Sequence, residues 1–424
     1  MRKHLIATLA TAYAVGSFAH TGAPAVELTR PLYALTSLDL LAQAPASLKV
    51  LEKDVATGTA VVSMDEDAAS FLSRKAHEKG RCGGFEALPE LGAVQAQAHK
   101  STRQQARRLL ADLRTQTVLQ SAPTARVSLE LIRRDSIANA ANQVQSANVR
   151  DTVTWFSAFN NRYNRDPQAN VPVQALRDKL ALLVKDIPGA TVDLISHNST
   201  PQKSIRVHLP GTSRPSEIVV LGGHLDSING WGRAGVRAPG ADDNASGVAS
   251  LTEALRIVAT LPRTARSVEF FFYAGEESGL LGSAEIAQDY RSRNVDVVGV
   301  LQLDMTLHPG SGSLVIASMT DFTNAWMREL VVELNRHYVN ARVVEDKCGY
   351  GCSDHASWFR RGYPTAMPFE ARFDDMNHSI HTLDDVINSR SDFEHAAAFS
   401  KLAVSLALEL GDSTARAPAS RPTL

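Results

Sequence analysis

The chain has 424 residues, of which 44% are hydrophobic and 21% charged, and its formal net charge is −1. This composition is sufficient for a large hydrophobic core divided among one to three domains. Because no long basic block is present, the composition argues against nucleic acid as a partner.

Residues 1–25 have the organisation of a secretory signal peptide. A positive segment at 2–4 precedes an apolar run at 5–15, and small residues suited to cleavage follow at 19–25. The apolar run is too short to span a bilayer, which takes about 20 residues. A buried N-terminal helix is the alternative, but the basic start and the small-residue exit favour export. We therefore expect a secreted or periplasmic protein without a membrane span.

Residues 26–126 form a mixed segment that contains no cluster of metal ligands. Its clearest helical signal is the Ala-, Gln- and Arg-rich stretch at 93–119. The chain has three cysteines, and export permits disulfides. Cys348 and Cys352 are close enough in sequence for a local bridge, which leaves Cys82 as an odd cysteine that needs an explanation.

Residues 127–412 alternate between strand and helix patterns. Their continuous apolar runs are typical of strands that are buried on both faces of a sheet. The predicted strands are 192–196, 204–209, 217–222, 267–273, 297–303, 313–317 and 366–368, and the predicted helices are 246–260, 279–293, 321–337 and 393–410. The alternation predicts a three-layer α/β/α fold with a mostly parallel central sheet. Residues 413–424, rich in Ser, Thr, Pro and Ala, are predicted to be a disordered tail.

Five side chains that can bind metal follow in order along this region. They are His224, Asp243, Glu277, Asp304 and His381. Ligands gather beyond the carboxyl ends of strands in open α/β sheets, and most of these residues follow a strand-like run. Two imidazoles and three carboxylates suit a pair of zinc ions better than one, because the carboxylates and a hydroxide balance the charge of two ions.

Each of these residues also has an ordinary structural explanation. A lone histidine is often satisfied within the core, and the acidic turn around Asp243 offers helix caps, a role that we assign to Asp242 and Asn244. Asp226 faces the same way as His224, two residues earlier, and is expected to accept a hydrogen bond within the same site. The metal site is favoured because all five side chains are expected on one face of the fold.

Glu276 and Glu277 are consecutive, so their side chains diverge and cannot share one role. One is expected to bind metal and the other to face the metal-bound water. Like charges held together raise the pKa of one carboxyl, which suits a general base near neutral pH. The whole set predicts a hydrolytic metalloenzyme that uses water to attack an amide.

Six segments resemble the M28 family of dizinc aminopeptidases, specifically the secreted bacterial leucyl aminopeptidases. They are GGHLDS, PGADDNASG, EESGLLGS, LQLDMT, CGYGCSDHASW and SIHT. The resemblance implies the zinc-peptidase (phosphorylase/hydrolase-like) architecture and two zinc ions. His224 and Asp304 would bind one zinc, Glu277 and His381 would bind the other, and Asp243 would bridge both.

The resemblance also implies roles for the surrounding residues. Glu276 would be the general base and acid, Asp226 would support the histidine ligand, and Tyr350 would stabilise the tetrahedral intermediate. Asp243 would form a cis peptide bond with Asn244, and the two cysteines of CGYGC would form a disulfide. An apolar pocket for the N-terminal side chain of the substrate would be lined by Met305, Cys352, Phe369, Phe373 and Ile380, with Met376 where relatives can carry an aromatic residue.

The implied enzyme is a monomeric zymogen. A processing protease would remove residues 26–126 as a propeptide, in which Cys82 would lie in a structural turn or cap a zinc ion in the latent form. The mature enzyme would remove large apolar residues such as Leu from the N-termini of peptides or proteins. Two alternatives remain: another amidohydrolase on the same fold (a carboxypeptidase, acylamino-acid hydrolase or glutaminyl cyclase) and a non-catalytic binding protein.

Overall fold

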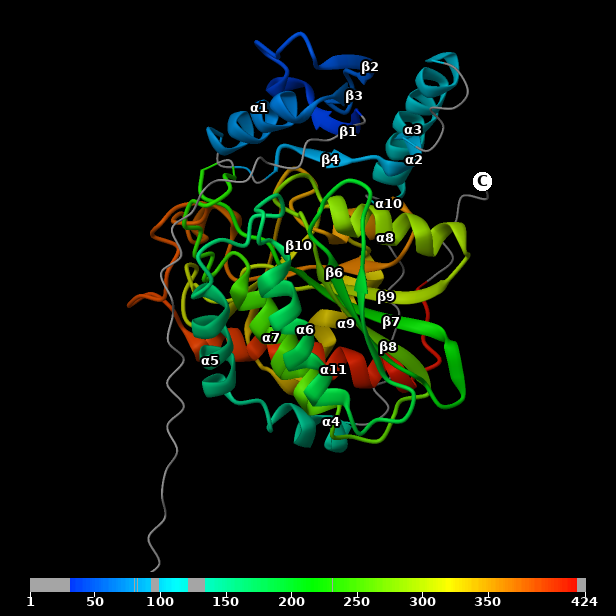
Figure 1. Cartoon of the computed structure of the whole chain (residues 1–424). Coiled ribbons are helices and arrows are strands. Elements are labelled where there is room, and N and C mark those ends of the chain that lie inside the picture. The colour runs from blue at the N-terminus through cyan, green and yellow to red at the C-terminus, as the bar shows by residue number, and fades with distance from the viewer. Residues whose placement is uncertain are drawn as a thin grey trace, which may run out of the picture.

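The computed structural model describes residues 31–417 except 80, 82, 93–98, 121–133 and 231. The predicted signal peptide, Cys82 and residues 418–424 of the predicted tail therefore lie outside the described residues. A small N-terminal unit lies against one end of a larger α/β unit (Figure 1). Among the described residues, no helix combines the length and the apolarity needed to cross a membrane.

The N-terminal unit is a four-stranded antiparallel sheet with helices on both faces. The strand order is β2-β3-β1-β4. One face of the sheet packs on α1, and the other face packs on α2 and α3. The elements are β1 (Leu32–Ser37), η1 (Leu38–Leu40), β2 (Lys49–Asp54), β3 (Thr59–Met64), α1 (Glu66–His77), β4 (Phe85–Ala87), α2 (Pro89–Gly92) and α3 (His99–Gln120).

The α/β unit is built on a six-stranded sheet in the order β12-β9-β7-β8-β6-β5. Its first four strands run parallel, and β6 and β5 are antiparallel to their neighbours. A second sheet has the order β11-β10-β13. The strands are β5 (Thr191–Ile195), β6 (Ser204–Leu209), β7 (Arg214–His224), β8 (Arg266–Tyr273), β9 (Asp296–Gln302), β10 (Val315–Met319), β11 (Arg342–Asp346), β12 (Thr365–Ala366) and β13 (Pro368–Phe369).

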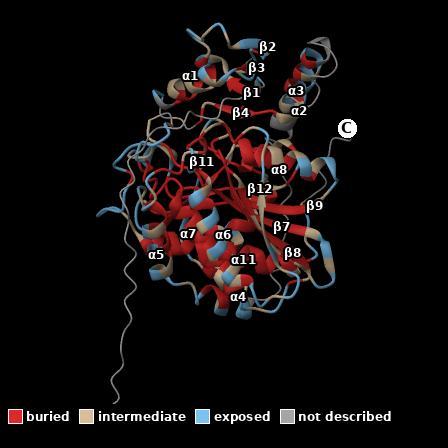
Figure 2. Ribbon diagram, in the orientation of Figure 1, coloured by how far each residue is buried: buried red, intermediate tan, exposed pale blue. Residues whose placement is uncertain are grey.

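Helices cover both faces of the six-stranded sheet, which confirms the predicted three-layer α/β/α fold with a mostly parallel sheet. One face shares a core with α4, α5, α6, α7, α9 and α11, and the opposite face shares a core with α8 and α10. Buried residues are concentrated in this sheet and in α7 and α11 (Figure 2). The helices are α4 (Arg134–Ala141), α5 (Ser146–Ser157), α6 (Asn170–Val184), α7 (Ala245–Val258), α8 (Leu281–Ser292), α9 (Ala325–Tyr338), α10 (His355–Arg360), η2 (Phe373–Asp375) and α11 (Phe393–Asp412).

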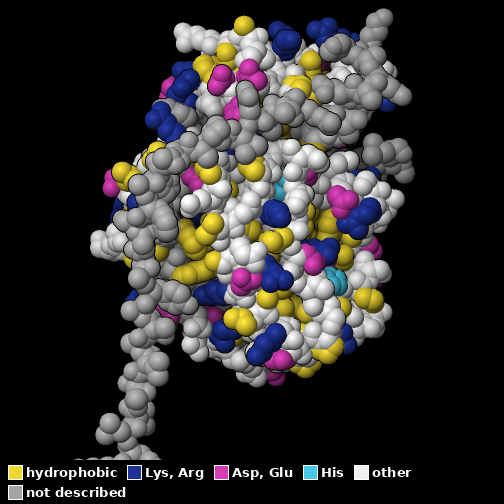
Figure 3. Space-filling model, in the orientation of Figure 1, with side chains coloured by type: hydrophobic (Ala, Val, Ile, Leu, Met, Phe, Trp, Pro, Cys, Tyr) yellow, Lys and Arg dark blue, Asp and Glu magenta, His cyan; other side chains and the backbone are white. Residues whose placement is uncertain are grey.

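The predicted elements of the α/β unit correspond to observed ones, and the strand predicted at 204–209 coincides with β6. The helices α4, α5, α6 and α10 and the strand β11 were not predicted. The six residues of α10 are too few to establish a helical period. Residues 413–417 were expected to be disordered, but Arg416 forms ion pairs with Glu217 and Asp296. On the face shown in Figure 3, charged side chains of both signs are interspersed.

Two glycines before His224 allow the central strands and the segment after β9 to pack closely. A Cβ atom on Gly222 would lie 2.4 Å from Cε2 of Tyr273, and one on Gly223 would lie 2.8 Å from the carbonyl oxygen of Leu303. Since β7 pairs with both β8 and β9, these contacts place the end of β7 between the ends of its two neighbours.

We expect Gly222→Ala to lower the free energy of unfolding by about 1–3 kcal/mol, because the new methyl group overlaps the ring of Tyr273 in a packed core. Urea denaturation measures the loss. In a Tyr273→Leu background the same substitution should cost less, since the overlapping ring is gone. An equal loss in both backgrounds would contradict this packing argument.

Candidate metal centre

The five predicted metal ligands converge beyond the carboxyl ends of three parallel strands. His224 is the last residue of β7, Glu277 follows β8, and Asp304 follows β9. Asp243 lies just before α7, and His381 lies in the loop before α11. The first four are buried at 5% relative exposure or less, so the site lies inside the protein rather than on an acidic surface turn.

The ligands form two groups that share Asp243. In the first group, Nε2 of His224 lies 3.0 Å from Oδ1 of Asp243 and 3.2 Å from Oδ1 of Asp304. In the second group, Nε2 of His381 lies 2.9 Å from Oδ2 of Asp243 and 2.9 Å from Oε2 of Glu277. The two oxygens of Asp243 therefore face separate groups, as a carboxylate does when it bridges two metal ions.

The donor set fits metal ions. In each group one ligand atom per residue can be chosen so that all lie within 4.8 Å of one another. Oε1 of Glu277 has no hydrogen-bond partner among the described residues, and a buried carboxylate is costly unless a cation or donors compensate it. Imidazole nitrogens and carboxylate oxygens are typical zinc ligands.

Asn244 connects the bridging carboxylate to the neighbouring strand. The Asp243–Asn244 peptide bond is cis, as the resemblance implied. The Asn244 side chain accepts a hydrogen bond from the amide of Gly247 at the start of α7 and donates one to the carbonyl oxygen of Leu303. Asn244 therefore caps α7, as predicted, and also ties that helix to the segment that carries Asp304.

Asp226 holds the loop that carries the two consecutive glutamates. Its carboxylate oxygens accept hydrogen bonds from the amides of Glu276 (3.0 Å) and Glu277 (3.3 Å). Its Oδ1 lies 3.5 Å from Nδ1 of His224, whereas that ring nitrogen is 3.1 Å from the backbone oxygen of Asp226. Asp226 therefore contacts both the imidazole and the glutamate loop.

The two glutamates are buried in a crowded acidic environment. Burial raises the pKa of Glu276 well above its ordinary value, and the charge of Glu277 adds to this effect while His224 opposes it. Burial also raises the pKa of Glu277 to about 7, with repulsion from Asp243 as the next contribution. A cation in the site would favour the ionised form of both side chains.

The acidic loop around Asp243 is held by Asp385, a residue that no sequence pattern identifies. Asp385 is 1% exposed, and its carboxylate accepts hydrogen bonds from the amides of Asp242 (3.0 Å) and Asp243 (3.1 Å). In the sequence it is one of two aspartates in HTLDD, and nothing local distinguishes it from Asp384. Only its contacts 143 and 142 residues away identify it.

Two further buried residues support the same loops and were also missed. Arg162 donates to the carbonyl oxygens of Leu225, Pro239 and Gly240, and burial lowers its pKa to about 10. Ser353 donates a hydrogen bond of 2.5 Å to Oδ2 of Asp304. Arg162 belongs to no recognisable motif, so no sequence signal could have found it.

The predicted pocket residues gather beside the ligands. Met305, Phe369, Phe373 and Ile380 belong to one apolar cluster together with Met376 and both cysteines of CGYGC. The structure contains the Cys348–Cys352 disulfide. A small cavity of about 20 Å³ is bounded by Asp243, Glu276, Asp304, Met305, Tyr350, Cys352, Met367, Phe369, Phe373 and Met376.

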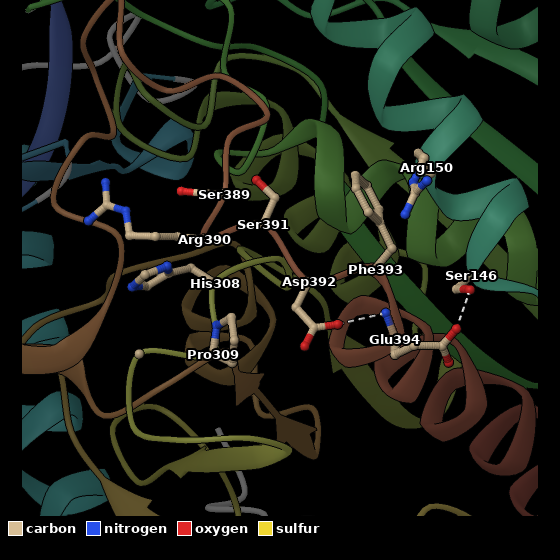
Figure 4. A pocket seen from close by; sticks show the side chains of 11 residues that line it. Ser146, Arg150, His308, Pro309, Ser389, Arg390, Ser391, Asp392, Phe393 and Glu394 are labelled. Atoms are coloured by element: carbon tan, nitrogen blue, oxygen red, sulfur yellow. Dashed lines mark hydrogen bonds between the residues drawn. The ribbon is translucent and has the colours of Figure 1, made fainter.

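A larger cavity, of about 590 Å³, lies elsewhere and includes none of the five ligands (Figure 4). Its side chains come from the starts of α5 and α11 and from the loop at His308. Asp392 caps α11, Glu394 accepts a hydrogen bond from Ser146, and Arg150 stacks on the ring of Phe393. These partners account for the charged groups at α5 and α11, so size alone does not make this cavity the catalytic site.

Comparisons with known proteins agree with the ligand geometry. The pattern of peptidase family M28 matches residues 204–407. Leucine aminopeptidase 1 of Paracoccidioides brasiliensis (strain Pb18) is 33% identical over 296 residues, which are 66% of this chain and 75% of that protein. A Zn-dependent exopeptidase from Parabacteroides distasonis ATCC 8503 shares the fold, with a TM-score of 0.52 and 17% identity over 62% of this chain and 97% of its own.

Similarity to solved structures extends beyond the α/β unit. The LapA aminopeptidase of Legionella pneumophila has a TM-score of 0.77 and 25% identity, covering 90% of this chain and 99% of its own. A match that covers 90% of this chain is longer than residues 127–424, so it cannot lie within those residues alone. The likeness therefore extends into the N-terminal unit.

We expect Asp385→Asn to weaken zinc binding by about 10- to 100-fold, because the amide nitrogen that replaces one carboxylate oxygen cannot accept a hydrogen bond from the Asp243 loop. Competition with a chromogenic chelator measures the zinc affinity. The matched control is Asp384→Asn, whose side chain is exposed and should leave the affinity unchanged. Equal affinities of the two variants would refute this role of Asp385.

Proposed function

Because this chain belongs to peptidase family M28 and is a metallo-aminopeptidase, we propose that it is an exported enzyme that removes large apolar residues such as leucine from peptide N-termini. The observation that carries this proposal is the meeting of three features in one place. Two ligand groups share Asp243, Glu276 lies beside them, and the same small cavity is lined by apolar side chains.

We propose two zinc ions as the cofactors. His224 and Asp304 would hold one ion, Glu277 and His381 the other, and Asp243 both. When bound, zinc would supply the nucleophile by lowering the pKa of a bridging water to about 7, and it would polarise the scissile carbonyl. The negative charge of the three carboxylate ligands supports two divalent ions rather than one.

The other residues would move a proton and stabilise charge. Glu276 would take the proton from the attacking water and deliver it to the leaving amine, which is a general base and acid role. Tyr350 lines the same cavity as Glu276 and would stabilise the developing oxyanion. Asp226 would keep the glutamate loop in place through its two backbone hydrogen bonds.

The apolar cluster supports a preference for large apolar side chains. Met305, Phe369, Phe373 and Met376 line the small cavity, and Ile380 packs against the same apolar cluster without lining the cavity. Methionine side chains adapt to the shape of a ligand, so we propose a pocket that accepts Leu and also tolerates Met- and Phe-like residues. The proposed substrate has a free N-terminal amine that can approach the metal ligands. This requirement distinguishes the proposed reaction from those of acylamino-acid hydrolases and carboxypeptidases.

Export and maturation also belong to the proposal. Residues 1–25 would direct secretion, and a processing protease would remove residues 26–126. The hydrophobic clusters between the N-terminal sheet and its helices contain no residues of the α/β unit. Removal would therefore leave the two main cores of the α/β unit intact, and the mature enzyme would act as a monomer.

We expect Glu276→Gln to lower kcat for Leu-p-nitroanilide by about 10²- to 10⁴-fold while zinc content stays at the wild-type level, because the amide cannot transfer the proton. Glu277→Gln should instead lower the zinc content. Metal analysis and steady-state kinetics separate the two effects. Near-wild-type turnover by Glu276→Gln would contradict the role of Glu276 as general base and acid. If the wild-type enzyme hydrolyses N-acetyl-Leu-p-nitroanilide as fast as Leu-p-nitroanilide, another amidohydrolase activity is favoured.

We expect kcat/KM for leucyl peptides to be highest at mildly alkaline pH. The α-amine of the substrate has a pKa of about 7.7–8.0 and must lose its proton to bind a metal ion. Activity should therefore rise as the pH increases toward that range. A pH–rate profile measures the dependence, and a clearly acidic optimum would contradict the scheme.

A further inference from the structure

Residues 274–278 form the glutamate loop, and side chains from elsewhere in the α/β unit bind every one of them. Asp226 accepts hydrogen bonds from the amides of Glu276 and Glu277. The other three residues of the loop bind three buried side chains: the amide of Ala274 donates to Ser204 (2.9 Å), the amide of Gly275 donates to Gln202 (3.1 Å), and the hydroxyl of Ser278 donates to Asn164 (2.8 Å). None of these three side chains belongs to the predicted site, so what they do for the loop needs its own explanation.

Gln202 uses both ends of its side-chain amide. The residue is fully buried, and its Oε1 accepts the hydrogen bond from the amide of Gly275. Its Nε2 donates a hydrogen bond of 3.0 Å to the carbonyl oxygen of Arg162. The guanidinium of Arg162 binds the carbonyl oxygens of residues 239 and 240, in the segment that leads to Asp243. One side-chain amide therefore connects the glutamate loop to the residue that supports the bridging ligand.

Asn164 belongs to the same buried network. Its Nδ2 donates a hydrogen bond of 3.0 Å to the hydroxyl of Thr200, which also accepts one of 3.3 Å from the amide of Gln202. Gly275 has a φ of 64°, a conformation that glycine adopts without strain. A Cβ atom on Gly275 would lie 2.9 Å from Nδ2 of Asn164. The glutamate loop is thus packed closely on Asn164 as well as bonded to it.

The two contacts lie on either side of Glu276. Gln202 holds Gly275, the residue before it, and Asn164 holds Ser278, two residues after it. A general base must stay within about 2.6–3.2 Å of the proton that it takes. A misplacement of about 1 Å can cost about 10²-fold in rate. The side chains that fix the loop on both sides therefore bear directly on the rate of proton transfer.

On the basis of the function proposed above, we propose that Gln202 and Asn164 are positioning residues for the general base. They act through the backbone of the glutamate loop and hold the carboxylate of Glu276 within reach of the attacking water. Because Gln202 also binds the carbonyl oxygen of Arg162, it fixes the glutamate loop relative to the segment that carries Asp243. The distance between the base and the bridging ligand then depends on a side chain outside both loops.

The first test replaces Gln202 by a side chain of similar length without hydrogen-bonding groups. Gln202→Met should lower kcat for Leu-p-nitroanilide by about 10- to 100-fold in excess zinc. Its KM should stay within about twofold of the wild-type value, because the loss concerns the transition state. The matched control is Asn335→Leu: Asn335 is 4% exposed, and its side-chain amide likewise binds a backbone amide and a carbonyl oxygen, both of Ala341. The control should keep the wild-type kcat.

Two further variants test whether the effect passes through Glu276. In a Glu276→Gln background, Gln202→Met should lower kcat by less than about twofold, because the group that it positions no longer transfers the proton. Ser278→Ala removes the hydroxyl that donates to Asn164 from a half-buried position, where truncation is compatible with folding. It should lower kcat by about two- to fivefold with KM unchanged.

Amide hydrogen exchange gives a readout that does not depend on activity or on bound zinc. In the metal-free protein, exchange over residues 274–278 should be about tenfold faster in Gln202→Met than in the wild type, because the amide of Gly275 loses its acceptor. Asn335→Leu should leave exchange in this loop unchanged. Each variant is expressed as the full chain and compared with the wild type in the form that the cells export.

Three results would overturn the inference. They are a wild-type kcat or unchanged loop exchange in Gln202→Met, an equal loss of kcat in Asn335→Leu, and a loss by Gln202→Met that adds in full to that of Glu276→Gln. Failure of the wild-type enzyme to hydrolyse Leu-p-nitroanilide would overturn the proposed function itself. The exchange measurement would still show whether Gln202 holds the glutamate loop.

Discussion

Crowding of buried negative charge around Asp243 is the constraint on which the rest of this structure depends. The buried carboxylates near it are those of Asp226, Asp242, Glu276, Glu277, Asp304, Asp354, Glu370 and Asp385. Burial raises the pKa of Asp242 to about 6 and of Asp354 to about 7. Such a group is stable only if backbone donors, a guanidinium or metal ions compensate its charge, and the site contains residues suited to each of these.

The buried carboxylates have different roles, which depend on the groups that they contact. Asp226 and Asp385 accept hydrogen bonds from backbone amides of the two ligand-bearing loops, so they hold those loops in position. Asp243 and Glu277 instead present oxygens to the histidine nitrogens. Arg162 remains a cation at neutral pH and binds three carbonyl oxygens beneath the same loops. Metal ions held by the two ligand groups would offset the negative charge that Arg162 does not balance.

The glutamate loop is held from two sides, which links catalysis to the N-terminal unit. Asp226 binds the amides of Glu276 and Glu277 from inside the α/β unit, and β4 binds the carbonyl oxygen of Gly279 from outside. The parallel strands bring the ligands together, while residues of the N-terminal sheet and Tyr350 line one cavity.

The amino-acid sequence by itself determined the strand–helix alternation, the five candidate ligands and the neighbouring glutamates, because each of these is a local pattern of neighbouring residues. It also allowed a local bridge between Cys348 and Cys352, which are four residues apart. Only the tertiary structure decided that Asp385 rather than Asp384 holds the Asp243 loop, that Arg162 lies beneath it, and that β4 reaches Gly279. These contacts join residues that are far apart in the chain. They depend on how the elements pack in three dimensions and not on any pattern of neighbouring residues.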